Sequence, residues 1–425
     1  MVEQEERYRA VALPSRTDGA VAVAGLAAMT IGQRISRFVI PPALLIVALV
    51  AYRFAMVRPV PDRVQPAKVE PWSIAPRYTE PRIATDEQLT AVLNRVKPPT
   101  AKEQMTNNFV HALRLWGTAA DFQDGKTPTG EELRQYFLDD KVFRKFAGEK
   151  AAPLFYYGRD GLDVRSFDEQ PAHRASSSYH IDDLLATLAE TGTSLDTPIL
   201  LRNGDQGTVS ELLNDSLRRF HLERFEYEWT AIVYGRYVFP LRQWKNKFGT
   251  RIDTNMLVKE LMDKPLDIGP CNGLHRLEAL VVLYRADEQA NALQPRTKRA
   301  ILQHMKRCSD LLVSAQHPEG YWTRSWPAGP GSQADKKANL HDKLLVTGHQ
   351  LEWLALAPEE VQPPRETIVR AGQWLVQTLT EMDEKELLGA YGPYTHAARA
   401  LCLWRGVDPY AAWKMGQAPE KANGG

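Results

Sequence analysis

The pattern of apolar and polar positions beyond residue 85 predicts helices and almost no strands. One kind of segment begins with a polar residue and continues with a run that is apolar nearly all round, such as LEALVVLY or AARALCLW. Helices of that kind are buried on both sides. We therefore expect these segments to form an inner layer, and they begin at His111, His180, Glu228, His275, His349 and His396.

The spacing of these segments indicates a repeat. Their starts are 69, 48, 47, 74 and 47 residues apart, and three of the intervals match the length of a helical hairpin with its loops. Repetition at such a period is typical of repeat architectures. The two longer intervals leave room for insertions.

Amphipathic segments alternate with the apolar ones and have the spacing of half-exposed helices. The first is DEQLTAVLNRV, and the others begin near Gly130, Thr208, Asp253, Arg296 and Glu366. Thr208 and Glu211 have the spacing of a capping box, which marks a helix start. Six inner and six outer helices predict an all-α domain at 85–415, an (α/α)6 toroid of six helical hairpins, followed by a disordered tail at 416–425.

The run from Phe38 to Val57 predicts one transmembrane anchor after an N-terminal tail at 1–37. Its twenty residues are apolar apart from Tyr52 and Arg53, and they can cross the ~30 Å hydrocarbon core of a bilayer as a helix. A cleaved signal peptide and a buried soluble helix are the alternatives. The 37 preceding residues exceed a normal n-region, and no clear A-x-A site follows.

Six prolines between residues 58 and 84 predict an extended, semi-rigid linker. The orientation of the anchor rests on two opposing arguments. Arg and Lys residues after the anchor favour a cytoplasmic domain, whereas the behaviour of N-terminal signal-anchors favours the opposite side. We expect a single-pass protein whose domain lies outside the cytoplasm and whose partner is the lipid bilayer.

The net charge limits the kinds of partner that we expect, whereas the cysteines carry little information. The formal net charge is +1 and no basic stripe is present, so we expect no nucleic acid partner. Cys271, Cys308 and Cys402 are widely spaced and form no CxxC pair, so they do not indicate the redox compartment.

In a closed ring the inner helices run the same way, so the residues at their starts are predicted to converge at one mouth. Five of the ten histidines occupy such positions. His275 with Glu278 and His349 with Glu352 share the pattern H-x-L-E. This spacing places a carboxylate beside an imidazole, where it can orient the ring and raise its pKa.

Other mouth positions are candidates for ligand binding. The offset of three residues recurs in His180 with Asp183 and in His396 with Arg399. A single histidine at a helix start is most often a cap or a core residue, and the shared register of five favours a functional site. We predict ligand contacts by His111, His180, Glu228 and Trp322.

Two chemistries fit this mouth. Helix N-termini depress the pKa of histidine, and a neutral histidine can act as a general base. The alternative is a metal, because Cys271, His275, His349 and His396 offer one thiolate and three imidazoles, which zinc accepts. Only Cys271 and His275 are close in sequence, so our expectation is acid–base chemistry without a metal or cofactor.

Three segments resemble N-acylglucosamine 2-epimerase-type enzymes, in which histidines at the barrel mouth move a proton at a sugar carbon. They are HRLEAL, GHQLEW and YTHAARAL, all within the last 160 residues. The resemblance implies catalytic roles for His275, His349 and His396, with Glu278, Glu352 and Arg399 in support. Order and spacing elsewhere depart from that family.

The segment LLVSAQHPEGYW resembles the QW repeat of terpenoid cyclases and prenyltransferase β-subunits, in which Gln and Trp tie a helix end to the next loop. The DxDD acid of the cyclases is absent. The zinc-binding D-x-C is absent too, since Asp267 stands four residues before Cys271. The resemblance implies the fold and not the activity. The whole chain most resembles uncharacterised bacterial membrane-anchored toroid proteins.

Three functions compete. The first is acid–base catalysis by the mouth histidines on a carbohydrate-like ligand. The second is a non-catalytic toroid that binds a ligand or partner protein at the cell envelope, and the third is an isoprenoid-handling enzyme. An aromatic-lined polar cavity favours the first, a filled cavity the second, and a wide apolar cavity facing the membrane the third.

Overall fold

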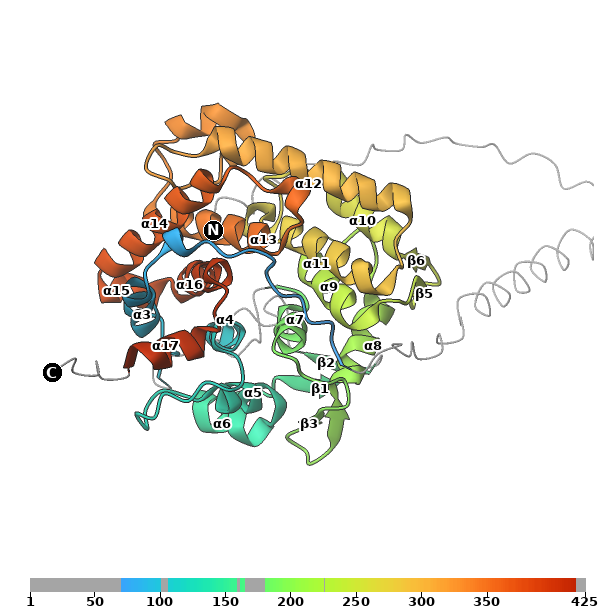
Figure 1. Cartoon of the computed structure of the whole chain (residues 1–425). Coiled ribbons are helices and arrows are strands. Elements are labelled where there is room, and N and C mark those ends of the chain that lie inside the picture. The colour runs from blue at the N-terminus through green and yellow to red at the C-terminus, as the bar shows by residue number, and fades with distance from the viewer. Residues whose placement is uncertain (1–69, 101–105, 159–160, 165–179, 225, 418–425) are drawn as a thin grey trace, which may run out of the picture. The chain divides into compact units, whose positions relative to one another are not determined.

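The computed structural model describes residues 70–100, 106–158, 161–164, 180–224 and 226–417 (Figure 1). All of them belong to the second of two compact units, Pro61–Gly425. The predicted tail at 1–37, the anchor at 38–57, the linker up to residue 69 and residues 418–425 lie outside the described residues. Among the described residues, no helix combines the length and apolar character that a membrane crossing needs.

The described residues are mostly helical, as the sequence predicts. Six helices are buried over most of their length: α4 (Thr106–Trp116), α7 (Asp183–Glu190), α9 (Glu228–Val233), α11 (His275–Ala290), α13 (Leu340–Leu356) and α16 (Tyr391–Arg405). Six more are the predicted outer helices: α3 (Asp86–Arg95), α5 (Gly130–Leu138), α8 (Val209–Arg219), α10 (Thr254–Asp263), α12 (Pro295–Ala315) and α14 (Arg365–Glu381).

Shorter elements connect these helices. They are α6 (Asp140–Ala147), α15 (Glu384–Gly389), α17 (Pro409–Gln417), the π-helical turn η5 (Tyr234–Val238) and the 3-10 turns η3 (Pro81–Ile83), η6 (Pro270–Gly273), η7 (Trp326–Ala334) and η8 (Glu359–Val361). Three antiparallel hairpins pair β1 (Phe155–Tyr157) with β2 (Leu162–Val164), β3 (Pro198–Leu200) with β4 (Gln206–Thr208), and β5 (Gln243–Lys245) with β6 (Arg251–Asp253).

The buried helices form a closed circle of contacts. Helix α4 contacts α7, and the contacts continue in chain order through α9, α11, α13 and α16, which contacts α4 again. Figure 1 shows these six around a common centre, with α3, α5, α8, α10, α12 and α14 outside them. Each outer helix packs on at least one inner helix.

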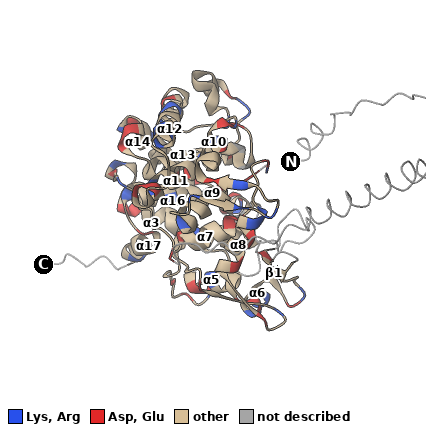
Figure 2. Cartoon of the chain, turned by 90° about the vertical axis from the view of Figure 1, so that its right-hand side faces the viewer, with Lys and Arg blue, Asp and Glu red and all other residues tan. Residues whose placement is uncertain are grey.

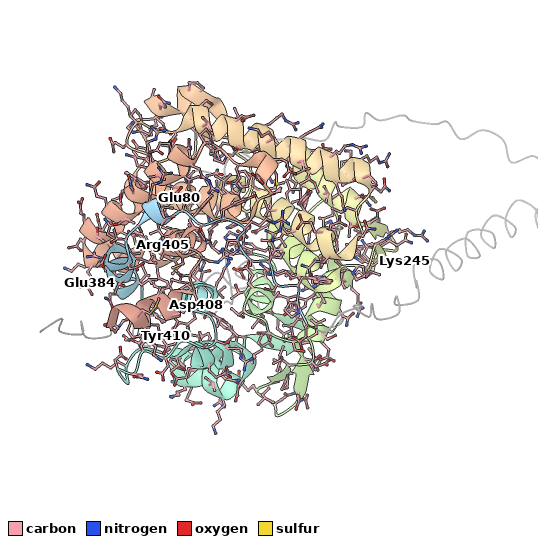
Figure 3. The ribbon with its side chains drawn as sticks, in the orientation of Figure 1. Glu80, Lys245, Glu384, Arg405, Asp408 and Tyr410 are labelled. Atoms are coloured by element: carbon pink, nitrogen blue, oxygen red, sulfur yellow. The ribbon has the colours of Figure 1, made fainter. Side chains whose placement is uncertain are left out.

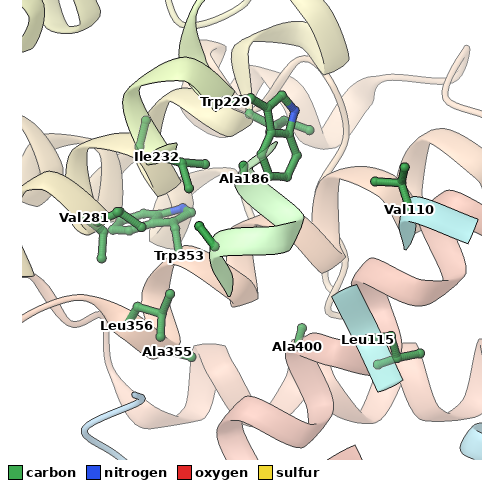
Figure 4. Packing of buried hydrophobic residues seen from close by; sticks show 14 of the residues in the cluster. Val110, Leu115, Ala186, Trp229, Ile232, Val281, Trp353, Ala355, Leu356 and Ala400 are labelled. Atoms are coloured by element: carbon green, nitrogen blue, oxygen red, sulfur yellow. The ribbon is translucent and has the colours of Figure 1, made fainter. Parts of the chain in front are cut away.

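Apolar side chains fill the space between the inner helices. Figure 4 shows Trp229 and Ile232 of α9 in the same region as Val281 of α11 and Trp353 of α13, and all four are buried. Burial of such a side chain stabilises the fold by about 1.5–3 kcal/mol. Charged residues are frequent on the outer helices α12 and α14 (Figure 2), which agrees with the amphipathic pattern of these segments.

Polar caps fix the starts of several outer helices. Thr208 accepts a hydrogen bond from the backbone N–H of Glu211, and the Glu211 side chain accepts one from the backbone N–H of Thr208, so the predicted capping box is present. Thr85 with Gln88 and Thr129 with Glu132 form two more. Such caps satisfy backbone N–H groups that have no partner within the helix.

The expectation that each histidine opens an inner helix is wrong for most of them. His349 is the tenth residue of α13, and His111 and His396 are each the sixth residue of α4 and α16. His180 precedes α7, and only His275 begins its helix, α11. The reason is that α4, α13 and α16 each begin before the apolar run that follows the histidine. Helix N-termini therefore do not explain the electrostatics of His111, His349 or His396.

The second half of the predicted linker packs on the helices. The backbone N–H of Trp72 donates to the Arg236 carbonyl at 2.8 Å, and that of Glu80 donates to the Trp404 carbonyl at 2.7 Å. Ile83 in η3 is fully buried. In Figure 3, Glu80 and Arg405 are labelled on one side of the helices and Lys245 on the other. Residues 70–84 thus cross the packed unit as an extended segment that ends in one 3-10 turn.

Helices α13 and α16 approach closely at Gly348. A Cβ atom on Gly348 would lie 2.9 Å from the backbone N of Ala397 and 3.2 Å from the carbonyl carbon of His396. We predict that Gly348→Ala lowers the free energy of unfolding by about 1–3 kcal/mol, because an added methyl group forces the two helices apart. Urea unfolding followed by circular dichroism measures the change.

The matched control is Gly389→Ala at the end of α15, where an added Cβ meets no atom within 4 Å. This change should leave stability within about 1 kcal/mol of the parent. Equal stability of the two variants would disprove the close approach at Gly348.

Candidate functional site

Five histidines from five separate segments converge inside the circle of inner helices. The ring centroids of His349 and His396 are 3.9 Å apart, and His275 lies 4.7 Å from His349 and 6.2 Å from His396. His180 lies 5.0 Å from His275, and His111 lies 5.2 Å from His396. We call these residues the histidine cluster. His275, His349 and His396 are only 2–3% exposed.

In four of the five imidazoles an oxygen atom lies within 3.2 Å of Nδ1. His349 Nδ1 lies 3.2 Å and His396 Nδ1 2.8 Å from Glu352 Oε2. His111 Nδ1 lies 2.8 Å from the Asn107 carbonyl oxygen, and His180 Nδ1 lies 2.6 Å from Glu226 Oε1. A carbonyl or ionised carboxylate oxygen only accepts. In the neutral forms of His111, His349 and His396 the proton is therefore on Nδ1 and Nε2 carries the lone pair, whereas Nε2 of His180 lies 3.6 Å from Cys271 Sγ.

His396 has a second neighbour, since Arg114 Nη1 lies 3.1 Å from the same Nδ1. A guanidinium only donates, so the two contacts compete for opposite tautomers. We assign the Nδ1 proton toward Glu352 because that contact is the shorter one.

His275 differs from the other four. Neither of its ring nitrogens has a hydrogen-bond partner among the described residues. The predicted support by Glu278 is therefore absent, and Glu278 Oε1 instead accepts from Arg114. Burial lowers the pKa of His275 to about 4, against the opposing effect of the neighbouring Cys271, so the ring is neutral near pH 7.

Cys271 lies beside the cluster. Its Sγ atom is 3.6 Å from His180 Nε2, and it precedes His275 by one helical turn in η6. Burial acts to raise the pKa of the Cys271 thiol, but the neighbouring His275 and His180 outweigh it and lower this pKa well below its usual range. Cys308 and Cys402, in contrast, have raised pKa values because they are buried.

The pKa values of two other cluster histidines reflect their neighbours. Burial acts to lower the pKa of His349, but Cys271 and Glu352 raise it to about 9. Burial and the adjacent His349 hold the pKa of His396 well below its usual range. One imidazolium thus lies between two anions, next to a neutral ring.

A layer of buried ion pairs lies against the histidine cluster, and we call it the ion-pair layer. Arg114 contacts Glu190, Glu278 and Glu352. Arg399 Nη1 lies 2.8 Å from Glu352 Oε1 and 3.6 Å from Glu278 Oε1. Arg236 Nη2 lies 3.2 Å from Glu190 Oε1. Three guanidinium groups and three carboxylates therefore neutralise one another inside the circle of helices.

The pKa values of the carboxylates follow from this arrangement. Burial acts to raise the pKa of Glu190, but Arg114, Arg399 and Arg236 lower it to about 2. Burial also opposes ionisation of Glu352, yet His396 and Arg114 hold its pKa well below its usual range. Burial prevails at Glu278, whose pKa is raised.

Two predicted site residues do not join the cluster. Glu228 pairs with Arg276 at 3.1 Å and accepts from the backbone N–H of Tyr227. Trp322 is fully buried, and its indole N–H donates to the Leu312 carbonyl at 2.8 Å. Gln316 donates to the carbonyls of Gly320 and Thr367, so this segment ties the end of α12 to the following loop and to α14.

Four contributors were missed by sequence reasoning. Trp229, next to Glu228, has its ring 4.6 Å from that of His275. Arg114, Glu190 and Glu226 complete the ion pairs. Arg114 had a signal, because it follows His111 at the offset that joins His396 to Arg399. No local pattern marks Glu190 or Glu226.

The cluster contains groups of side chains with metal-ligand geometry. In each of the sets His180–Cys271–His275, His275–His349–His396 and Glu278–His349–Glu352, the potential ligand atoms lie within 4.8 Å of one another. A cavity of about 570 Å³ lies elsewhere and is lined by residues of η3, α3 and α14, including Arg82, Gln88 and Gln373.

Comparisons of the chain with protein-family models, with curated proteins and with solved structures found no match.

Arg114 offers a test of the ion-pair layer. We predict that Arg114→Met lowers the free energy of unfolding by about 3–5 kcal/mol, because it leaves three buried carboxylates short of a cation. Chemical denaturation of the variant and the parent at pH 7 measures the difference.

Arg144→Met is the control, because Arg144 pairs with Asp140 and Glu149 near the surface. It should cost less than about 1 kcal/mol. A loss of similar size in both variants would mean that the buried layer adds nothing specific.

Proposed function

We propose that this protein is an (α/α)6 toroid whose histidine cluster binds zinc, and that the bound ion activates a water molecule or a substrate hydroxyl. The supporting observation is the common orientation of the imidazoles. Nδ1 of His111, His349 and His396 lies within hydrogen-bond distance of an oxygen acceptor, so Nε2 is the atom that each of these rings would offer to a metal ion. Histidines that bind metals are usually held in this way.

The donor atoms favour zinc over the alternatives. Imidazole and thiolate ligands suit zinc and copper, whereas magnesium and calcium need oxygen ligands. The set His275–His349–His396 supplies three nitrogens. Three histidines around zinc leave a fourth position for water, whose pKa the metal lowers to about 7. The sequence pattern allowed a metal site as the alternative to acid–base chemistry by histidines alone, and this proposal adopts the metal site.

The substrate that we propose is a hydroxyl-rich, carbohydrate-like molecule, as the epimerase-type segments imply. Acid–base catalysis by the histidines without a metal remains the competing proposal. The 2–3% exposure of His275, His349 and His396 favours a further candidate, a structural zinc ion in a non-catalytic toroid. Azide added to the cobalt-substituted protein separates the catalytic zinc proposal from the structural one. Azide binds the metal only where a coordination position is open, and its binding changes the visible spectrum of cobalt.

Zinc binding is tested with His349→Gln. We predict that the purified full-length protein retains zinc and that the chelator-treated protein gains thermal stability when zinc is added. Ligand that binds only the folded state at 100 times its Kd adds about 2.7 kcal/mol. His349→Gln should reduce the zinc content and weaken zinc binding at least about tenfold, because a first-sphere nitrogen is lost. Elemental analysis and competition with a chromophoric chelator measure both.

His341→Gln is the matched control, since His341 is an exposed histidine of the same helix α13. It should bind zinc like the parent. A protein that stays free of zinc and shows no thermal shift on zinc addition would refute the proposal, and turnover by such a protein would favour metal-free acid–base catalysis.

We also propose that residues 38–57 anchor the protein in a membrane. The full-length protein should fractionate with membranes, and deletion of residues 1–57 should release a soluble domain with unchanged circular dichroism, because the described residues all belong to one compact unit that begins at Pro61. Uncleaved full-length protein in the soluble fraction would contradict this expectation.

A further inference from the structure

Two of the metal-ligand sets in the histidine cluster overlap at one residue. His275 belongs to the set with His180 and Cys271 and also to the set with His349 and His396. A single ion would use one nitrogen of His275 and would leave the second nitrogen without a metal.

The surroundings of His275 leave both nitrogens available. Neither Nδ1 nor Nε2 has a hydrogen-bond partner among the described residues, and the residue is 98% buried. The other four cluster histidines have an oxygen atom at Nδ1. Buried polar atoms without partners are costly, and a metal ion on each side of the ring would satisfy both nitrogens.

The set that contains Cys271 has the dimensions of a zinc site. Zn–S and Zn–N bonds of about 2.3 and 2.0 Å at the tetrahedral angle place sulfur and nitrogen about 3.5 Å apart. The distance from Cys271 Sγ to His180 Nε2 is 3.6 Å. His180 is held through Nδ1 by Glu226 at 2.6 Å, so its ring has the support expected of a zinc ligand.

The third set, Glu278–His349–Glu352, does not fit a cation. Glu278 and Glu352 already pair with Arg114 and Arg399. A divalent ion there would lie next to two guanidinium groups that cannot lose their charge. The two sets that share His275 contain no such competing cation.

We propose that the cluster holds two zinc ions and that His275 bridges them, one ion being bound with His180 and Cys271 and the other with His349 and His396. The inference rests on the proposed zinc site and adds a second ion to it. The first ion takes the lone pair of the neutral ring, and the ring proton remains on the other nitrogen. Binding of the second ion releases this proton to solvent, and the resulting imidazolate coordinates both ions.

The experiment counts zinc ions in the full-length protein purified in detergent. The protein is stripped with a chelator, reloaded with zinc sulfate and dialysed, and zinc per chain is measured by elemental analysis. We expect two zinc ions per parent chain and one in Cys271→Ser and in His349→Gln, because each variant damages one set. His275→Gln damages both sets and should retain less than one.

Cobalt provides an independent readout for the two positions. The parent loaded with Co²⁺ should show a thiolate-to-cobalt charge-transfer band, and Cys271→Ser should lose this band while it keeps the d–d bands of the histidine-bound ion. Cys308→Ser is the matched control, since Cys308 is a buried cysteine of α12 outside the cluster. It should keep two ions and both spectral features.

The zinc counts distinguish the bridge from the single zinc site. One zinc ion per parent chain that is lost in both Cys271→Ser and His349→Gln would leave the zinc proposal intact and overturn the bridge. Two ions retained in His275→Gln would also overturn the bridge. A parent that binds no zinc would end both proposals. If His275→Gln does not fold by circular dichroism, the counts for Cys271→Ser and His349→Gln still decide.

Discussion

The buried contacts of Arg114 are the interaction on which the other features depend. This residue of α4 reaches Glu190 of α7, Glu278 of α11 and Glu352 of α13, so it joins the first inner helix to helices far along the chain. Removal of charges from water costs several kcal/mol per ion unless good partners are present. Arg114 has those partners only when the circle of inner helices is closed, which makes closure and charge pairing mutually dependent.

Glu352 connects the ion-pair layer to the histidine cluster. Its Oε1 atom faces Arg114 and Arg399, while Oε2 lies against Nδ1 of both His349 and His396. The close approach of α13 and α16 at Gly348 brings those two rings to 3.9 Å. The guanidinium groups thus fix the carboxylate, and the carboxylate fixes the orientation of both imidazole rings.

The sequence was sufficient for the helices and for the convergence of the histidines, because apolar periodicity and repeat spacing are local signals. It was insufficient for helix starts, since the polar residues before His349 continue the same helix α13. It also misplaced Glu228, whose partner Arg276 depends on how α9 and α11 are rotated. Pairings such as His180 with Glu226 join segments whose register only the packed fold sets. The role of Arg114 could have been predicted, because Arg114 follows His111 by three residues just as Arg399 follows His396.

Charge balance explains why a thiolate matters at this centre. The three guanidinium groups and three carboxylates of the ion-pair layer cancel, so this layer contributes little net charge to a neighbouring cation. Neutral imidazoles contribute none. A divalent ion in a buried site needs nearby anions, since burial of uncompensated charge is costly. Cys271, which lies beside the cluster, becomes anionic more readily than an ordinary thiol, because its pKa is lowered by His275 and His180 against the effect of burial. The ion next to Cys271 is therefore better compensated than one bound by histidines alone, and it should be the last to leave under a chelator.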